Sequence, residues 1–374
     1  MSISSESNTS TQPILISTPS QLQACVAQLL GGEFVAVDTE FVREQTYFPQ
    51  LCLIQLGDAE RQYCVDALAV TDLNPLSALL DSPRLIKLFH AASQDLEIFV
   101  RLFGRCPKPL FDTQTAAAML GLGDQLGYAG LVEKLCGVKL DKSLSRTNWA
   151  RRPLSAPELA YAAADVDYLA RMYPQLRQRL HDKGRLPWLE QEGQRQAVAE
   201  RYQAHPEQEW KRLKGLAKLD ALAQHTAAAL ATWRERRAMA SDRPRKWILA
   251  DDVLYRLAER RPQDMAQLQA LTLLPPATLH KHGEALLALI NQVDASAARQ
   301  PLLGERLPEA EHKACFKRLS QGLREIAGRL QVPSALLANR ADLERLATQG
   351  AAADIPLLSG WRAEVAGRAL LAER

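Results

Sequence analysis

The sequence predicts an α/β domain with a mixed sheet, followed by two all-helical domains, and three observations support this prediction. Strand-like apolar runs alternate with helical runs up to about residue 112. From about residue 205 onward, apolar residues recur at helical spacing and no segment is typical of a strand. A stretch containing proline and charged residues, QPLLGERLPEAEH (300–312), divides the helical part in two. Interleaved strands and helices favour a mostly parallel sheet with some antiparallel pairing.

The expected elements of the α/β domain follow one another closely. One helix is expected at about 19–30, and another is expected to open at Ser93 and to close near Gly104. The runs 51–57 and 61–68 are separated by a short turn, so we expect them to pair antiparallel. The other expected strands are the apolar runs 34–41, 84–91 and 109–113.

Length and composition set the outer limits. A chain of 374 residues exceeds what one core usually organises, and 47% hydrophobic with 24% charged residues is typical of a globular protein. No run reaches the ~18 apolar residues that a membrane helix needs, and the polar start does not resemble a signal peptide. The six cysteines form no C-x-x-C pair, which indicates buried or free thiols in a reducing cytoplasm. The predicted bounds are a disordered tail at 1–12, the α/β domain at 13–185, a linker helix at 186–204, and helical domains at 205–294 and 305–374.

Two acidic residues interrupt an apolar strand. In FVAVDTEF (34–41), Asp38 and Glu40 project from the same face because side chains alternate along a strand. Two neighbouring carboxylates repel and are costly to desolvate, so a positive group is expected to compensate them. The alternative is a strand end at which both acids reach solvent.

Two further acidic positions lie on helices. In HAASQDLEIF (90–99), Asp95 falls in the first helical turn, where the helix dipole favours an acid without any further role. In YAAADVDYLARMY (161–173), Tyr161 and Asp165 are four residues apart and share one helical face. A structural hydrogen bond would also explain that pair.

Together these motifs indicate a metal site. Asp38, Glu40, Asp95 and Asp165 supply the hard oxygen ligands that Mg²⁺ or Mn²⁺ prefers, and clusters of histidine or cysteine typical of zinc are absent from the sequence. Two such ions stabilise the attacking and leaving oxygens of a phosphoryl displacement. The pattern therefore favours a two-metal phosphodiesterase.

The three motifs, Asp38-Thr39-Glu40, HAASQDLE with Asp95, and Tyr161-x-x-x-Asp165, resemble those of the DEDD exonuclease superfamily. Ala160 occupies the position of the histidine in the sister branch, so the resemblance is to the tyrosine branch. In layout the chain is similar to the bacterial ribonuclease D family, and RPRKWILADDVLYRLAERRP (243–262) resembles an HRDC module. The resemblance implies a ribonuclease H-like (DnaQ-like) fold with two HRDC domains.

The resemblance also implies a function and roles for single residues. It implies a 3′→5′ exoribonuclease that releases nucleoside 5′-monophosphates, acts on tRNA precursors and other structured RNA 3′ ends, and requires no protein partner or membrane. Asp38 would bridge both ions, Glu40 and Asp165 would complete the site that activates water, and Asp95 would hold the second ion. Tyr161 would orient the water. We expect Asp112 chiefly to cap the turn after its strand.

RNA-binding candidates are cationic or planar groups, because phosphates attract the former and bases stack on the latter. The helical region contributes two groups of basic residues, and these groups also contain three tryptophans. We expect the tryptophans to belong mainly to the core. The candidate RNA contacts are His90, Gln94, Arg146, Arg151, Arg234, Arg237, Arg243 and Lys246.

Two other functions fit part of the pattern. A DNA 3′→5′ exonuclease would share the metal site, and digestion of labelled RNA and DNA would separate the two. A catalytically inactive nucleic-acid-binding protein would have lost ligands, but all four acids and Tyr161 are present.

Overall fold

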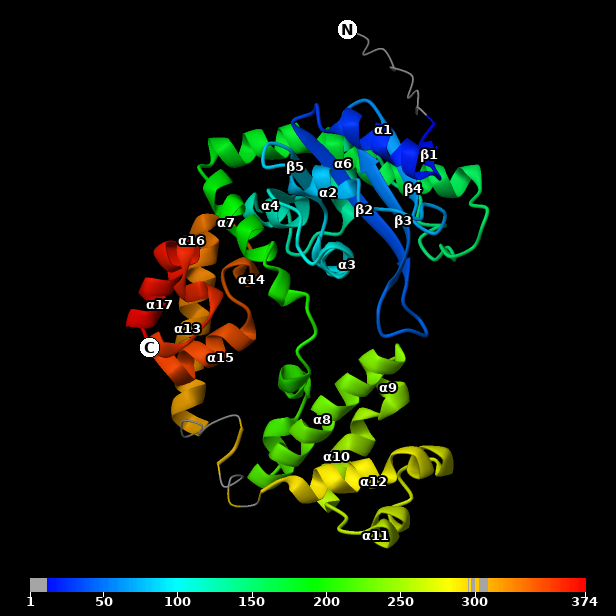
Figure 1. Ribbon diagram of the computed structural model, residues 1–374. Helices are drawn as coiled ribbons and strands as arrows, with labels where there is room; N and C mark the ends of the chain where they lie inside the picture. Colours follow the sequence, from blue (N-terminus) through cyan, green and yellow to red (C-terminus); the bar gives the residue numbers. More distant parts are fainter. Residues whose placement is uncertain (1–11, 295, 297–299, 303–308) are drawn as a thin grey trace. The chain divides into compact units, whose positions relative to one another are not determined.

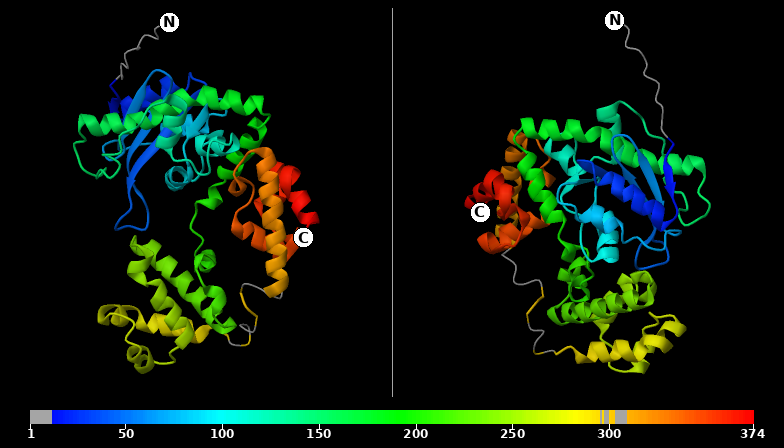
Figure 2. Two further views of the ribbon diagram at one scale, coloured as in Figure 1. Left: turned by 180° about the vertical axis from the view of Figure 1, so that it is seen from behind. Right: turned by 45° about the horizontal axis from the view of Figure 1, so that its top comes forward.

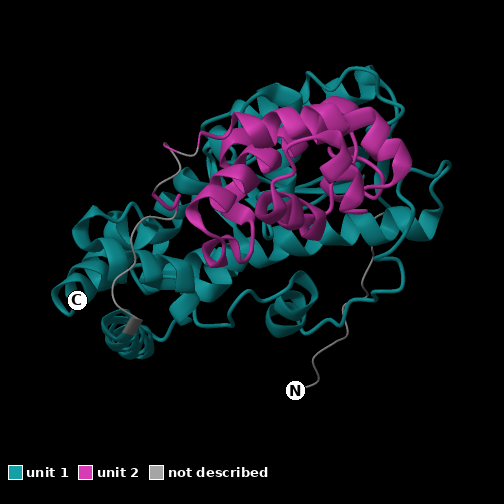
Figure 3. Ribbon diagram, turned by 90° about the horizontal axis from the view of Figure 1, so that it is seen from below, with its two compact units in different colours: residues 1–42, 51–203, 307–374 teal, residues 43–50, 204–306 magenta. Residues whose placement is uncertain are grey.

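The computed structural model describes residues 12–294, 296, 300–302 and 309–374, so the tail expected at 1–12 lies outside the described residues except for Gln12 (Figure 1). The chain forms two compact units (Figure 3). Unit 1 comprises Met1–Val42, Leu51–Gln203 and Leu307–Arg374, and unit 2 comprises Arg43–Gln50 and Ala204–Arg306. Both units are therefore assembled from separate stretches of the sequence.

Unit 1 contains a six-stranded mixed sheet in the order β1-β4-β3-β2-β5-β6. The pairs β1–β4, β2–β5 and β5–β6 are parallel, and β3–β4 is antiparallel, as expected from the turn between them. The sequence did not reveal β1, because three residues are too short for a periodic signal. The strands are β1 Ile14–Ile16, β2 Phe34–Val42, β3 Gln50–Gly57, β4 Gln62–Asp66, β5 Ile86–Phe89 and β6 Leu110–Asp112.

Helices cover both faces of this sheet (Figures 1 and 2). One core lies between the sheet and α1 Pro19–Leu29, α2 Leu76–Asp81 and α3 Ser93–Phe103. The other lies between the sheet and α4 Thr113–Met119, α5 Tyr128–Cys136 and the 27-residue α6 Ala156–Asp182. Helix α3 ends at Gly104 in the left-handed conformation, as expected, but its N-cap is Ala92 rather than Ser93 and makes no side-chain bond.

The helices from residue 309 onward extend the core of the α6 face. Buried residues of these helices form one continuous apolar cluster with residues of α4, α5, α6 and α7 (Leu186–Gln196). Glu192 of α7 accepts hydrogen bonds from Trp361 Nε1 at 3.0 Å and from Arg362, and the Trp188 and Trp361 rings stack at 4.6 Å. The elements are α7 Leu186–Gln196, α13 Glu309–Leu330, α14 Ser334–Leu337, α15 Arg340–Gln349, α16 Gly360–Arg362, the π-helical turn Ala363–Gly367 and α17 Arg368–Ala372.

Unit 2 has a helical core of its own. Residues 204–294 contain no strand, as expected, and their buried leucines and alanines form a separate apolar cluster. The helices are α8 Ala221–Ser241, α9 Arg245–Ile248, α10 Asp251–Arg260, α11 Met265–Ala270 and α12 Pro276–Gln292. In the part of the chain that the structure describes, no helix has the length and apolar character needed to cross a membrane.

Candidate active site

Strand β2 divides its polar residues between two faces of the sheet. Asp38 and Glu40 are half-buried on one face, and the intervening Thr39 is buried on the other. Asp165 of α6 meets the first two, so that one carboxylate oxygen from each of the three lies within 4.8 Å of the others. Alternation along β2 and the position of α6 over this face thus bring together three acids that are far apart in sequence.

Asp95 reaches the same region from the first turn of α3. It is buried, and the Thr39 hydroxyl donates a hydrogen bond of 2.6 Å to its Oδ1. Asp95 is not part of the group of three oxygens, but its charge raises the pKa of Glu40. Asp95, the fourth expected acid, is therefore close enough to act electrostatically on Glu40, and Thr39 holds its carboxylate.

The pKa values of all four carboxylates are raised, chiefly by burial. Burial raises the pKa of Asp38 to about 6, against a backbone hydrogen bond from Thr39 that lowers it. Burial, and then repulsion from Asp38, Asp165 and Asp95, raises the pKa of Glu40 to about 9. Burial and the charge of Asp38 also raise the pKa of Asp95 and of Asp165 well above their ordinary values. Such a set of hard oxygen donors suits one or more divalent cations.

Tyr161 lies one helical turn before Asp165, half-buried, with its ring stacked 6.2 Å from that of Trp149. Burial, and then the charges of Asp165 and Glu40, raises the pKa of Tyr161 to about 12. The phenol is therefore neutral near pH 7. It can donate a hydrogen bond to a bound water, and it is a poor proton acceptor.

Tyr128 of α5 is a site residue that sequence reasoning missed. Its hydroxyl lies 2.9 Å from the carbonyl oxygen of Ala164 and 2.5 Å from that of Asp165, so it braces α6 at the position of the acid. The His90 ring lies 5.5 Å from the Tyr128 ring, and His90 Nδ1 is 2.9 Å from Thr113 Oγ1. Burial lowers the pKa of His90, so its ring is neutral near pH 7. Through its contacts with Thr113 and Tyr128 the ring packs against α4 and α5. No spacing signal marks a tyrosine at the start of a helix as functional.

Asp112 has the structural role expected of it. Its carboxylate caps α4 by accepting from the amides of Gln114 at 2.8 Å and Thr115 at 3.2 Å. It also accepts from the amides of Ala91 and Ala92, just before α3. Asp112 thus fixes the turn from which Asp95 projects.

The expected RNA contacts differ in exposure. Arg234 is 6% exposed, and its guanidinium donates to Leu249 O at 3.0 Å and Asp251 Oδ1 at 2.6 Å. Its burial corrects the expectation that it contacts RNA, because Arg234 is a structural residue of unit 2. Arg151 is exposed but pairs with Glu158 at 2.7 Å. The other expected contacts with exposed side chains are Gln94, Arg146, Arg237, Arg243 and Lys246.

The three tryptophans of unit 2 also differ. Trp210 and Trp233 pack partly buried against the helical core, as expected. Trp247 is 59% exposed and directly follows Lys246. An exposed indole beside a cation is a suitable surface for stacking a base.

Known protein families match the region of the sheet in unit 1 and the helical region of unit 2. Residues 13–181 match a 3′-5′ exonuclease family, and residues 224–290 match the HRDC domain family. Ribonuclease D of Acidiphilium cryptum is 41% identical over 95% of this chain and 91% of its own length. Ribonuclease D of Gluconacetobacter diazotrophicus is 38% identical over 96% of this chain and 92% of its own length.

Solved structures agree with these sequence matches. Escherichia coli RNase D, described as an exoribonuclease involved in structured RNA processing, is 34% identical with a TM-score of 0.88, over 96% of this chain and 98% of that one. The catalytic core of RRP6 from Trypanosoma brucei is 25% identical with a TM-score of 0.60, over 78% of this chain and 82% of that one. With Asp38, Glu40 and Asp165 converging on one face of the sheet, the chain belongs to the ribonuclease D family and is a 3′→5′ exoribonuclease.

Proposed function

We propose that Asp38, Glu40, Asp95 and Asp165 hold two divalent cations, Mg²⁺ or Mn²⁺, for hydrolysis that releases nucleoside 5′-monophosphates from RNA 3′ ends. The observation that carries the proposal is the convergence of oxygens from Asp38, Glu40 and Asp165 within 4.8 Å. The raised pKa of Glu40 supports it, because a carboxylate beside three others needs a cation to remain ionised at neutral pH.

The chain's own residues divide the work. Asp38, Glu40, Asp95 and Asp165 would hold the cations, and the charge of Asp38 acts on each of the other three acids. When bound, the cations supply Lewis acidity to the phosphate and lower the pKa of the attacking water. Tyr161, whose phenol is neutral near pH 7, would donate a hydrogen bond that orients this water. Tyr128 positions the backbone at Asp165.

The proposed substrates are structured RNA precursors in the cytoplasm, with tRNA precursors foremost. The Escherichia coli relative's described role in structured RNA processing supports this choice. We assign catalysis to a domain at 13–185, followed by a linker at 186–204 and helical domains at 205–294 and 305–374. The proposed phosphate contacts are Arg146 and Arg151 near the catalytic residues and Arg237, Arg243 and Lys246 in unit 2, with Gln94 at the start of α3.

The test is a 3′-extended tRNA incubated with wild-type protein, with Asp38→Asn and with the matched control Asp167→Asn. Asp167 lies two residues from Asp165 but pairs with Arg171 at 2.9 Å, outside the group of acids. We expect Asp38→Asn to lower kcat by on the order of 10³-fold or more with little change in RNA affinity, and the control to remain active. Chelation should stop the wild type, and restored Mg²⁺ or Mn²⁺ should restart it.

Two outcomes would contradict the proposal. Equal turnover by Asp38→Asn and wild type would remove Asp38 from the metal site. Faster digestion of DNA than of RNA strands of the same sequence would favour the alternative substrate. Tyr161→Phe sharpens the assignment further, because loss of the hydroxyl should lower kcat while leaving KM nearly unchanged.

A further inference from the structure

The loop between β2 and β3 belongs to unit 2 together with Gln50, the first residue of β3, although the rest of both strands belongs to unit 1. The chain leaves unit 1 after Val42 and returns to it at Leu51. The residues between, Arg43–Gln50, form unit 2 together with Ala204–Arg306. Arg43 follows Glu40 by three residues. The strand that carries Asp38 and Glu40 therefore continues directly into a segment held by the helical domain.

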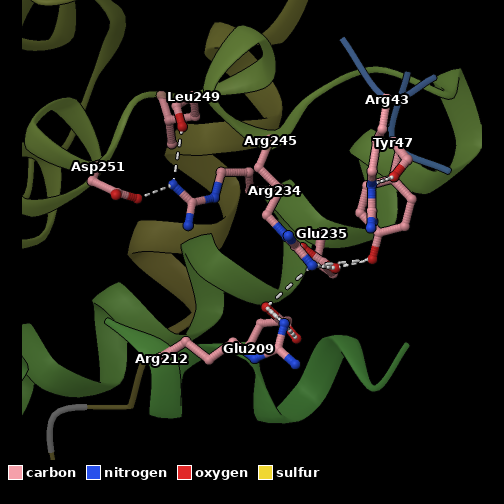
Figure 4. Close-up of polar contacts among 9 residues, drawn as sticks. All are labelled: Arg43, Tyr47, Glu209, Arg212, Arg234, Glu235, Arg245, Leu249 and Asp251. Carbon is pink, nitrogen blue, oxygen red and sulfur yellow. Dashed lines mark hydrogen bonds and ion pairs between the residues drawn. The ribbon is translucent and has the colours of Figure 1, made fainter. Parts of the chain in front are cut away.

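Tyr47 is the centre of this attachment (Figure 4). Its side chain is 6% exposed, and its hydroxyl donates to Glu235 of α8, which is 1% exposed. Arg245 donates to the Tyr47 hydroxyl at 3.2 Å and to Glu235 at 2.6 Å, and its guanidinium lies 5.0 Å from the centre of the Tyr47 ring. Three polar groups thus satisfy one another in a largely buried position.

The backbone of the loop is held as well. Asp242 is the C-cap of helix α8 and has a left-handed backbone with φ 46°. Its Oδ1 accepts from the amides of Tyr47 at 3.1 Å and Phe48 at 3.0 Å. Apolar contacts with Ala238 and Ile248 of unit 2 cover the Tyr47 side chain. One carboxylate therefore fixes two consecutive amides of a segment that lies nearly 200 residues earlier in the chain.

These contacts are more elaborate than joining two strands requires. Two adjacent strands can be connected by a loop of about two to five residues that needs no outside partner. Burying Glu235 beside Arg245 contributes little net stability, because desolvation offsets most of the attraction. Such a network specifies one geometry, and the geometry it specifies in this protein is that of the chain that follows Glu40.

We propose that Tyr47, Glu235, Asp242 and Arg245, together called the Tyr47 anchor, are positioning residues through which the helical domain of unit 2 holds Asp38 and Glu40 in their productive geometry. The proposal rests on the assignment of Asp38 and Glu40 as metal ligands. It gives the helical domain a role in the hydrolytic step itself, in addition to any contact with RNA.

The test compares full-length variants on a single-stranded RNA of ten nucleotides. Asp242→Ala removes the acceptor of both loop amides. Asp242→Asn keeps the Oδ1 acceptor and should restore both wild-type hydrogen exchange and wild-type kcat. The matched control is Arg236→Gln in α8, the helix that Asp242 caps, and it breaks an exposed ion pair with Glu207, which lies outside that helix. Tyr47→Phe removes only the hydroxyl that binds Glu235.

We expect hydrogen exchange at the amides of residues 47 and 48 to accelerate in Asp242→Ala, while the rest of α8 keeps its protection. In the same variant kcat should fall on the order of tenfold with KM nearly unchanged, because small displacements of reacting groups are costly. The Mg²⁺ concentration for half-maximal rate should rise. Tyr47→Phe should change these quantities in the same direction by a smaller amount.

Unchanged exchange at residues 47 and 48 would overturn the anchor, since its hydrogen bonds would then not hold the loop. Faster exchange with wild-type kcat and wild-type Mg²⁺ dependence would overturn the positioning role. Failure of the metal assignment would look different, because the wild-type protein would then hydrolyse RNA in the presence of chelator.

Discussion

The helices α13–α17 of unit 1 and α8–α12 of unit 2 are both all-helical regions, yet their apolar faces pack against different partners. The first group shares one core with α4, α5, α6 and α7 beside the sheet. The second group encloses a core formed almost entirely by its own residues. The same helical periodicity therefore produces two outcomes. In unit 1 the C-terminal helices add to the core beside the sheet, and in unit 2 the helices pack on one another.

The polar contacts of the two regions follow the same division. Glu192 of α7 receives Trp361 and Arg362 from the C-terminal helices, and Arg185 donates to Leu330 O at 2.5 Å. In unit 2, Arg234 of α8 instead binds Leu249 and Asp251 of the same helical domain. Buried charges therefore show which neighbour each helical region has.

Removing residues 309–374 should have a larger effect on the fold than any single substitution. The deletion exposes apolar faces of α4, α6 and α7, so we expect loss of the native nuclease fold and of RNA hydrolysis. Near-UV circular dichroism and activity on a short RNA measure the outcome. A truncated protein with wild-type melting behaviour and turnover would show that the shared core is dispensable.

Trp361→Ala probes the same contact with a single change. Trp361 is 2% exposed, stacks on Trp188 and bonds Glu192, so we expect a loss of ~3–5 kcal/mol in the free energy of unfolding. The matched control is Trp247→Ala, whose side chain is 59% exposed and should cost about 0.5 kcal/mol or less. Equal losses in both variants, measured by denaturant titration, would contradict the assignment of Trp361 to the core.

Leu254→Ala tests whether unit 2 is energetically separate. Leu254 is fully buried in the unit 2 core, and its truncation should cost ~2–5 kcal/mol. We expect faster hydrogen exchange in α8, α10 and α12, with unchanged protection in α6 and α13. Equal deprotection of α6 would mean that the two units unfold together.

Glu158→Gln should have the smallest effect and depend on pH. Glu158 forms a capping box with Ser155 at the start of α6 and pairs with Arg151, and these bonds lower its pKa to about 2. Because the folded-state pKa lies below the ordinary value, the stabilisation is fully present above about pH 4.5 and is lost as the pH falls towards 2. We expect the variant to lose ~1 kcal/mol at pH 7 and the difference from wild type to shrink at pH 3. A difference that is constant between these pH values would refute the role of the carboxylate charge.

Sequence alone predicted most of the sheet and placed Asp38 and Glu40 on one face of it, because both depend on local periodicity. Asp38 and Glu40 interrupt an apolar strand, and Tyr161 and Asp165 share a helical face, so their directions follow from backbone geometry. The antiparallel pairing of β3 and β4 followed from the short turn between them. These predictions needed no knowledge of distant contacts.

Contacts between distant segments could not be predicted in this way. Helical spacing identifies an apolar face but not its partner, so it could not show that Trp361 packs on α7. Arg234 looked like a surface cation because its acceptors, Leu249 O and Asp251 Oδ1, lie later in the chain and no local pattern indicates them. Tyr128 and Tyr47 carry no motif, and their roles follow only from the carbonyls and carboxylates that surround them.

The interrupted order of the two units has a consequence for synthesis on the ribosome. Tyr47 and Glu235 are 188 residues apart, so at roughly 5–20 residues per second the emerging tyrosine waits roughly 10–40 s for its partner. Trp361 follows Glu192 by 169 residues, and α6 and α7 therefore leave the exit tunnel well before the helices that cover them. A nascent chain stalled between these points would present uncovered leucines and tryptophans, a natural target for a co-translational chaperone.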